Sequence, residues 1–557
     1  MTKRGLARFG SAAAISVLLA GVSLAQQTPD EIAQLKAQVQ QLQQQLQTLS
    51  KKLDAATAKT DAAPTANTAS NNDAAPAIPA ANPQPTRPLI ASTTPMIAPP
   101  PVTRPSASSP LSAPSPRFTP YQAPDSPLQL KLGDVSITPI GFMDLTGVWH
   151  DKVAGGSIGT SFGSIPYGNV YQTNLNEFRL SIQNSRIGFR VDGDVKGAHV
   201  IGYMEADFLG NAPANLVVSS NSNTLRSRLY WVDVSKNGWE LLGGQTWSLM
   251  TPGRTGISPL PGNLFYTQNM DTNYQAGLVW ARQPEVRLVY HASDKAAFAL
   301  AIDDPEQYFG GSSGGPSPTL PSALSALAGT QLNNGQTTTS VPNIAPDVIA
   351  KLAFDPSKVF HVEFGGIERS FKIANPVNLQ KFSAQGAGGF LNLNFQIAPG
   401  LRILTNNYWS DGGGRYMFGQ APDLIVRADG SISPIHSGST VTGFEWMRKN
   451  TLIFGYYGGI YVQRNSAVDA NGKTLVGYGF SGSASSNNRT IQEATIGFNQ
   501  AFWKDPRYGA LNLIFQYDYL QRNPWSVAAG SPSNASLNEV FVDLRYTLPG
   551  AAPATTK

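Results

Sequence analysis

The stretch LNLIFQYDYL at positions 511–520 alternates large apolar side chains with polar ones. Successive side chains of a β-strand point to opposite faces, so this pattern predicts a strand with one oily face and one polar face. The same alternation occurs far away in EFRLSIQ at 177–183 and again in EVFVDLRY at 539–546. Between 137 and 548 the pattern recurs, interrupted by Gly, Asn, Asp and Ser, without any stretch of helical periodicity.

Strand length distinguishes the two classes of protein that show this alternation. A soluble β-sandwich has strands of about five or six residues, whereas strands that cross a bilayer at a tilt need about nine to eleven. The alternating segments here run for about 9 to 17 residues, and aromatic pairs such as Tyr408-Trp409 and Phe502-Trp503 stand near their ends. No segment after the first 25 residues is apolar for long enough to cross as a helix. We therefore expect an all-β transmembrane barrel.

The connections between the segments support a closed barrel. About sixteen alternating segments can be counted, and an antiparallel barrel of this kind requires an even number. The connections alternate strictly between short turns, such as 236–238, and long loops, such as 304–346 and 412–438. Short turns at one rim and long loops at the other are typical of outer-membrane barrels. The sixth segment is expected from Tyr274 to Tyr290, because splitting it at Pro284 would break the alternation.

Residues 1–25 are predicted to be a secretory signal peptide. Lys3, Arg4 and Arg8 precede an apolar run that closes on small residues at Ala25. These three residues supply much of the formal net charge of +5, so charge says little about the exported protein. Export and the absence of Lys/Arg runs argue against nucleic acid as a partner. The chain has no cysteine, so the exported protein is stabilised without disulfides.

Residues 28–53 are expected to form a short periplasmic coiled coil. Thr28, Pro29 and Glu31 provide the N-cap, the first helical position and a capping box. Apolar residues then follow at spacings of three and four, as on the a/d seam of a heptad: Ile32, Leu35, Val39, Leu42, Leu46, Leu49 and Leu53. So narrow a seam favours an oligomer over a lone helix docked on a core.

The remaining segments divide by composition. Residues 54–136 are rich in Ala, Pro, Ser and Thr, which predicts a disordered, extended linker that cannot build a core. The barrel is assigned to 137–548, and residues 549–557 form a tail after the last aromatic strand. The predicted order is therefore signal peptide, coiled coil, linker, barrel and tail.

This order resembles that of the DcaP-like trimeric outer-membrane porins. Local phrases also carry the resemblance, namely NSRIGFR at 184–190, YMEADF at 203–208 and LGGQTW at 242–247. The resemblance implies a homotrimer in a Gram-negative outer membrane, inserted by the barrel assembly machinery and surrounded by lipid and lipopolysaccharide. It also implies three pores that pass small solutes, often anionic or dicarboxylate. The long linker and the C-terminal tail depart from the family pattern.

Inward-facing charges would set the selectivity of such a pore. Strand parity places five arginines on the polar phase of neighbouring wall, with a phase shift at Asn184-Ser185: Arg179, Arg186, Arg190, Arg226 and Arg228. Arg226 and Arg228 oppose the apolar Leu225 and Leu229, and Arg402 is a further candidate for the same positive surface. Arg282 and Arg287 have opposite parity and cannot both face inward without a bulge. A stripe of guanidinium groups would favour anionic solutes.

Two alternatives concern this stripe and the third long loop. Glu205 and Asp207 lie on the polar phase of the intervening strand, so the arginines could instead form a paired ladder that only satisfies charges in the wall. The loop 249–273, which carries Arg254 among prolines and glycines, is the candidate for an inward-folded constriction. An ordinary surface loop is the alternative.

Two other functions, a barrel hydrolase and a structural anchor, are alternatives to a pore. A barrel hydrolase would need a nucleophile paired with a histidine, but none of the five histidines stands in a G-x-S-x-G phrase or at metal-ligand spacing. We therefore expect no enzyme, no cofactor and no metal. A structural anchor would tether the outer membrane to the cell wall, although the linker offers few basic residues for wall contact, chiefly Arg87, Arg104 and Arg117.

Overall fold

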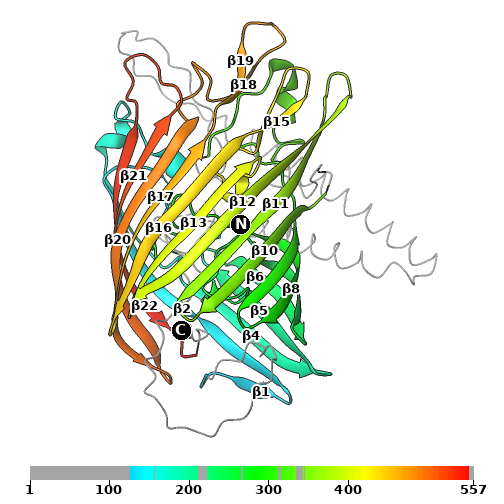
Figure 1. Ribbon diagram of the computed structural model, residues 1–557. Coiled ribbons are helices and arrows are strands. Elements are labelled where there is room, and N and C mark those ends of the chain that lie inside the picture. Colours follow the sequence, from blue (N-terminus) through cyan, green and yellow to red (C-terminus); the bar gives the residue numbers. More distant parts are fainter. Residues whose placement is uncertain are drawn as a thin grey trace, which may run out of the picture. The chain divides into compact units, whose positions relative to one another are not determined.

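The computed structural model describes residues 126–550, apart from 156, 211–222, 265–266, 312–314, 334–342 and 344. The predicted signal peptide, the coiled coil, most of the linker and nearly all of the tail lie outside these residues. The described residues form a closed antiparallel β-barrel whose strands tilt against its axis (Figure 1). Among them, no helix is both long and apolar enough to cross a membrane.

Sixteen staves make up the barrel wall, where a stave is one strand or two strands that lie end to end. The sheet contains 18 strands, but β1 (Leu130–Leu132) is only a short hairpin partner of β2, and β3 and β4 lie end to end along β2 as one stave. The wall strands are β2 (Val135–His150), β3 (Glu177–Ser181) with β4 (Arg186–Val195), β5 (Ala198–Asp207), β6 (Arg226–Lys236), β7 (Trp239–Trp247), β8 (Arg282–Ser293), β9 (Ala296–Asp303), β10 (Asp347–Ser357), β11 (Phe360–Ala374), β12 (Lys381–Ala398), β13 (Leu401–Asp411), β16 (His436–Arg448), β17 (Thr451–Val462), β20 (Asn488–Asp505), β21 (Gly509–Pro524) and β22 (Ala535–Thr547).

The barrel closes between its first and last strands. β22 pairs with β2 in a register that runs from Phe142 opposite Thr547 to His150 opposite Glu539. Every other stave pairs with its neighbours in the sequence, so the chain runs up and down around the wall. The predicted sixteen-strand antiparallel barrel is therefore confirmed.

Short turns and long loops alternate as expected. β6 and β7 are joined only by Asn237 and Gly238, whose φ angles are 54° and 83°. Two central residues at positive φ make a type I′ turn, whose twist matches that of the flanking strands. The long loops carry the remaining small elements: η1 (Phe162–Ser164), η2 (Tyr171–Asn174), η3 (Pro261–Asn263), η4 (Ser322–Leu327), η6 (Gly414–Tyr416), β14 (Leu424–Val426), β15 (Ile432–Pro434), β18 (Asn465–Val468) and β19 (Leu475–Tyr478).

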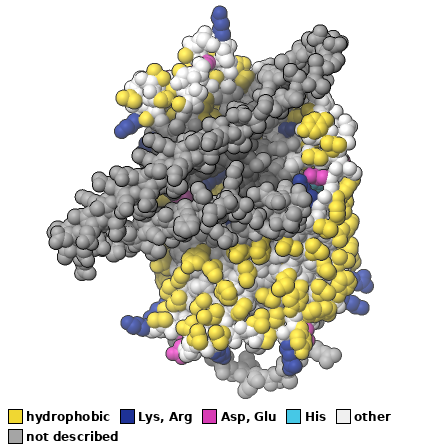
Figure 2. Space-filling view, turned by 180° about the vertical axis from the view of Figure 1, so that it is seen from behind, with side chains coloured by type: hydrophobic (Ala, Val, Ile, Leu, Met, Phe, Trp, Pro, Cys, Tyr) yellow, Lys and Arg dark blue, Asp and Glu magenta, His cyan; other side chains and the backbone are white. Residues whose placement is uncertain are grey.

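The wall exposes apolar side chains on its outer face and buries polar ones inside, which is the reverse of a soluble β-sheet protein. On β22, Val542 and Leu544 are each 45% exposed, whereas Asp543 and Arg545 beside them are buried. Figure 2 shows the resulting band of hydrophobic side chains on the face turned away in Figure 1. Apolar side chains in such a band are stable against lipid chains, and a closed barrel leaves no backbone group unpaired there. The strands are therefore membrane-spanning.

Two local predictions are wrong. The sixth strand passes through Pro284 as expected, but it begins at Arg282 and not at Tyr274. Tyr274, Leu278 and Trp280 are buried in the preceding loop, where their apolar side chains mimic a strand in the sequence. Leu229, assigned to the lipid face, is fully buried because the register between β5 and β6 shifts at this point.

Candidate functional site

Residues 248–264 and 267–281, the described part of the long loop between β7 and β8, lie inside the barrel. Its Thr251 carbonyl accepts a hydrogen bond of 2.9 Å from Lys351 of β10, and the Gly253 amide donates one of 2.9 Å to Glu363 of β11. β10 and β11 lie further around the wall than β7 and β8, the two strands that the loop connects. A loop that reaches β10 and β11 must therefore leave β7 and turn inward. We call these described residues the inward loop.

The inward loop also reaches the opposite wall. The side-chain amide of Asn269 donates to Glu493 of β20 at 2.8 Å, and the Val279 amide donates to Asn406 of β13 at 3.0 Å. Contacts with β10, β11, β13 and β20 mean that the loop crosses the bore. This loop was the candidate for an inward-folded constriction, and it does not have the alternative form of an ordinary surface loop.

Aromatic packing holds the inward loop against other loops. Trp280 stacks on Phe418 with ring centroids 5.3 Å apart, and Phe418 meets Phe162 edge to face at 5.8 Å. Trp247, at the end of β7, lies 5.7 Å from Trp280. Three long loops therefore share one hydrophobic cluster within the barrel. Such packing restrains the loop.

A cavity of about 650 Å³ lies between the inward loop and the wall. Its lining includes residues of the short turns, such as Asp294-Lys295, Lys358 and Gly400, so it lies at the short-turn rim. The loop side contributes Arg254, and the wall contributes Arg402. Two predicted candidates, Arg254 of the third long loop and Arg402 of the extended positive surface, therefore line the same cavity.

Arg254 and Arg402 flank one carboxylate. The two terminal guanidinium nitrogens of Arg254 donate hydrogen bonds of 3.1 and 3.2 Å to the carboxylate of Glu445 on β16. The Tyr456 hydroxyl donates to the same carboxylate at 3.0 Å. Arg402 on β13 lies close to both Arg254 and Glu445 and interacts electrostatically with each. Two guanidinium groups beside one carboxylate leave this part of the cavity with a positive excess.

The charged lining as a whole is also slightly cationic. Arg254, Arg402, Lys295 and Lys358 face Asp294, Asp355 and Glu445, and His361 adds a titratable group. Guanidinium forks match the planar geometry of carboxylates. The arrangement suits an anion small enough to enter the cavity.

The predicted arginine stripe on β4 and β6 differs from the cavity lining, because its arginines are paired with carboxylates of β5. Arg228 contacts Glu205 at 2.6 Å and Asp207 at 3.0 Å, and Arg226 contacts Asp207 at 2.7 Å. Arg186 lies 3.5 Å from Glu205. These five residues, which we call the wall cluster, all face inward but form a paired ladder. Glu205, Asp207 and Arg228 expose 1% or less of their surface.

The other predicted residues lie apart from the cavity lining. Arg190 pairs with Asp192 at 2.6 Å and is buried in the wall. Arg179 is 47% exposed in its side chain and lies 3.3 Å from Glu177. Arg287 faces inward and contacts Glu285 at 2.6 Å, while the Arg282 guanidinium packs over the Trp247 ring at 5.2 Å. The stripe therefore does not line the cavity.

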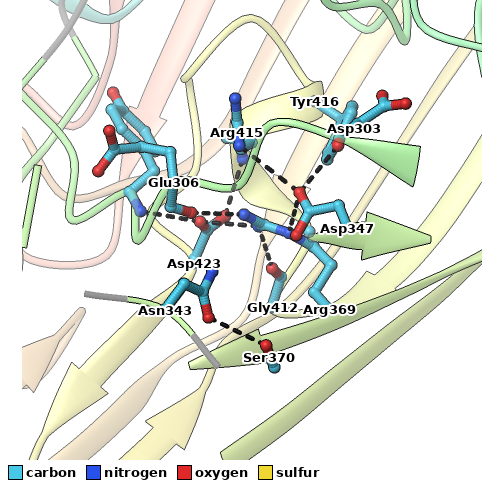
Figure 3. A network of polar contacts seen from close by, with 12 residues as sticks. Asp303, Glu306, Asn343, Asp347, Arg369, Ser370, Gly412, Arg415, Tyr416 and Asp423 are labelled. Atoms are coloured by element: carbon cyan, nitrogen blue, oxygen red, sulfur yellow. Dashed lines mark hydrogen bonds and ion pairs between the residues drawn. The ribbon is translucent and has the colours of Figure 1, made fainter. Parts of the chain in front are cut away.

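A second polar network, which sequence reasoning missed, centres on Arg369 of β11 (Figure 3). Arg369 contacts Asp347 of β10 at 2.9 Å and Asp423 at 2.7 Å, and it donates to the Gly412 carbonyl at 2.7 Å. Burial raises the pKa of Asp423, although Arg369 opposes the rise. The network fixes loop 412–435 to the wall. The sequence alone could indicate only that Arg369 faces the inside of the barrel on its strand.

A buried carboxyl also anchors the inward loop. Asp271 accepts hydrogen bonds from the Thr160 amide at 3.0 and 3.1 Å and from the Asn273 amide at 2.6 Å. Burial raises the pKa of Asp271 to about 6, although these hydrogen bonds oppose the rise. Within the described part of the chain, no cluster of three or more His, Cys, Asp or Glu could hold a metal ion.

A closed sixteen-strand barrel with an apolar outer face and a long loop folded into its bore belongs to the porin type of membrane barrel. No protein-family model matches the sequence, and no curated protein matches it either.

Solved structures do match. The outer membrane channel DcaP of Acinetobacter baumannii aligns with a TM-score of 0.53 and 16% identity over 77% of this chain and all of its own. The anion-selective porin from Comamonas acidovorans aligns at 0.41 and 13% over 74% of this chain and 100% of its own. OmpT of Vibrio cholerae aligns at 0.40 and 11% over 75% of this chain and 99% of its own. The resemblance to DcaP-like porins is confirmed in the fold.

Proposed function

We propose that this protein is an outer-membrane porin through which small anionic solutes, dicarboxylates among them, diffuse passively. The observation that carries the proposal is the placement of Arg254 and Arg402 on an open cavity of about 650 Å³ between the inward loop and the wall. Cavities of several hundred Å³ match small-molecule ligands in size.

The physical role of each part follows from its position. The inward loop narrows the bore, so a solute passes close to charged side chains. Arg254 and Arg402 attract an anion by their charge, while Glu445, which accepts both hydrogen bonds of the Arg254 fork, keeps their combined charge from holding it too tightly. Conduction needs binding that is favourable enough for entry and weak enough for exit.

The assembly that we propose is a homotrimer. Its subunits would be joined in the periplasm by the coiled coil of residues 28–53, after the barrel assembly machinery has inserted each barrel. The short turns would face the periplasm and the long loops would face outward, among lipopolysaccharide. The solved likeness to a porin fold supports this orientation.

The histidines do not by their partners favour a pore over a hydrolase. Each lies beside a carboxylate: His150 beside Glu177 and Glu539, His199 beside Asp192 and Asp194, His291 beside Glu240, His361 beside Asp355 and Glu363, and His436 beside Asp411. A carboxylate also holds the histidine of a catalytic triad, so the preference for a pore rests on the sequence, where none of the five stands in a G-x-S-x-G phrase or at metal-ligand spacing.

Planar-bilayer recordings of the refolded, full-length exported chain test the proposal. We expect ion-sized conductance steps grouped in threes and a reversal potential under a salt gradient that shows anion preference. Cation preference would overturn the anionic selectivity. An absence of conductance from correctly folded protein would overturn the porin and favour a structural anchor to the cell wall.

A further inference from the structure

Two exposed arginines lie beside one tryptophan at the long-loop rim of the barrel. Trp525 directly follows β21, and its indole nitrogen donates a hydrogen bond of 2.9 Å to the Val462 carbonyl of β17. Tyr461, an outward residue of β17, lies 6.4 Å from the Trp525 ring, so this ring is on the outer side of the wall. The guanidinium carbons of Arg464 and Arg489 lie 4.8 and 5.8 Å from the centroid of the same ring. We call Arg464, Arg489 and Trp525 the rim cluster.

The positive charge of the rim cluster is not neutralised by a carboxylate. Within the described part of the chain, neither Arg464 nor Arg489 takes part in an ion pair or a side-chain hydrogen bond. The acidic residues of β20 and β21 toward this rim are Glu493 and Asp518, and both are buried inside the barrel. Asp469 accepts hydrogen bonds of 3.0 and 3.2 Å from the loop between β9 and β10. Two guanidinium groups without a carboxylate favour an anionic ligand.

The outward side chains below the rim cluster change from apolar to polar along each strand. β17, β20 and β21 are consecutive in the wall, so they share one continuous outer surface (Figure 1). Toward the long-loop rim, the outward series of β20 is Ile496, Ala494, Gln492 and Thr490, followed after a bulge by Arg489. The outward series of β21 is Phe515, Tyr517, Tyr519, Gln521 and Asn523, followed by Trp525. Ala494 pairs with Tyr519 and Thr490 with Asn523, so the two series change at the same depth.

Exposed tyrosines mark the lipid–water interface beneath the rim cluster. Tyr457 of β17 and Tyr519 of β21 are 52% and 41% exposed, and both lie opposite Ala494 of β20. Aromatic side chains of a membrane barrel form girdles at the two interfaces. Thr490 lies four residues further along β20, which is about 13 Å along the strand. The rim cluster, which lies beyond Thr490, is therefore at the level of the lipid headgroups.

The side chains of this surface match a phosphorylated sugar. A guanidinium group offers N–H donors in a fork that fits phosphate oxygens, and packing against an indole ring holds it in place. Below the arginines, Thr490, Gln521 and Asn523 offer hydroxyl and amide groups that can bond to sugar hydroxyls. The Asn523 amide donates to the Thr490 hydroxyl at 3.0 Å, which orders this layer. A phosphorylated glycolipid carries both kinds of group in its headgroup.

We propose that the rim cluster binds a phosphate group of lipopolysaccharide, the phosphorylated glycolipid of the outer leaflet. Arg464 and Arg489 bind the phosphate oxygens, and the layer of Thr490, Gln521 and Asn523 contacts the sugar. This binding fixes the outer face of β17, β20 and β21 to the leaflet and is separate from solute passage through the bore. Basic side chains at a membrane surface recognise anionic headgroups in this way. The inference rests on the proposed orientation, in which the long loops face outward.

Equilibrium binding of lipopolysaccharide to the full exported chain, folded in detergent micelles, tests the site. The probe is fluorescently labelled lipopolysaccharide, and the same lipid with its phosphate groups removed is the comparison ligand. The test variant combines Arg464→Gln with Arg489→Gln, which removes both charges and keeps polar side chains. The matched control is Arg427→Gln, because Arg427 is an exposed arginine on the turn between β14 and β15 and not on the wall. Heat modifiability on gels verifies the folding of each variant.

We expect the double variant to bind the intact lipid at least about tenfold more weakly than the wild type, because hydrogen bonds to a charged group are lost. Arg427→Gln should keep the wild-type affinity. The wild type should bind the dephosphorylated lipid as weakly as the double variant binds the intact one. Equal affinity of the wild type and the double variant would overturn the site, and so would an equal loss in the control or an undiminished affinity for the dephosphorylated lipid.

Two further measurements separate the site from free phosphate and from the pore. Inorganic phosphate should not release the bound lipid, and release would show that the arginines bind free phosphate and overturn the lipid as their ligand. Conductance of the double variant should equal that of the wild type, because the rim cluster is not part of the cavity lining. Unchanged lipid binding in a double variant that conducts normally overturns the lipid site alone. Normal lipid binding by a folded protein that does not conduct overturns the porin alone.

Discussion

Two groups of arginines inside the same barrel differ in what surrounds them. In the wall cluster, Arg228 contacts two carboxylates and exposes no side-chain surface. At the cavity, Arg254 and Arg402 flank a single carboxylate and line an open volume of about 650 Å³. Both groups face inward, yet only the second lies where a solute can reach it. Inward parity therefore identifies charge inside a barrel but not charge that is accessible.

The two environments also differ in energy. Removing one partner of a buried ion pair leaves the other charge without compensation and costs about 3–5 kcal/mol. The Arg254–Glu445 pair exposes 13% and 8% of its side chains and borders the cavity, so water can solvate a charge that is left behind and its loss costs less. The wall cluster should therefore govern stability, and the cavity arginines should govern selectivity.

The largest expected effect is on stability. Arg228→Met should lower the free energy of unfolding by about 3–5 kcal/mol, because Glu205 loses its shortest ion pair and Asp207 loses one of two. Urea unfolding in lipid vesicles measures the change. Arg226→Met is the matched control with a smaller loss, since Arg228 still pairs with Asp207. Unchanged stability with lost anion preference would reverse the roles of the two groups.

The next effect is on selectivity. Arg402→Glu changes the charge at the cavity by two units, and a unit charge about 10 Å away in a water-like medium is worth about 0.4 kcal/mol. The permeability ratio of anions to cations should therefore fall about tenfold. Reversal potentials under a salt gradient measure this ratio. Arg179→Glu, which lies outside the cavity lining, should leave the ratio unchanged, and an equal shift in both variants would contradict the assignment.

A third effect, confined to mildly acidic pH, concerns the loop that carries Arg254. Because burial raises the pKa of Asp271 from 3.8 to about 6, the folded protein binds a proton more tightly than the unfolded chain does. Stability should rise as the pH falls from about 6 toward 3.8, and Asp271→Asn should remove that contribution while keeping an acceptor oxygen. Thermal unfolding of both proteins above and below pH 6 measures the difference. An identical pH dependence in the two would show that Asp271 does not titrate in this range.

The sequence alone predicts strand parity and loop length. The alternation in 511–520 correctly placed Leu513 and Tyr517 outward and Gln516 and Asp518 inward on β21. Sixteen staves followed from the strict alternation of turns and loops. The error at Tyr274 has a physical cause, because apolar residues of a loop folded inside a barrel repeat like those of a strand.

The sequence by itself determined the wall, because each strand must present an apolar face to lipid and pair its backbone with two neighbours. Only the tertiary structure decided which charges are paired. Glu205 and Arg228 share an inward phase on adjacent strands, but their contact of 2.6 Å depends on the register shift between β5 and β6. The cavity joins Arg254 of a loop to Arg402 and Glu445 of distant strands. Such contacts depend on how the chain closes across the bore, which no local pattern encodes.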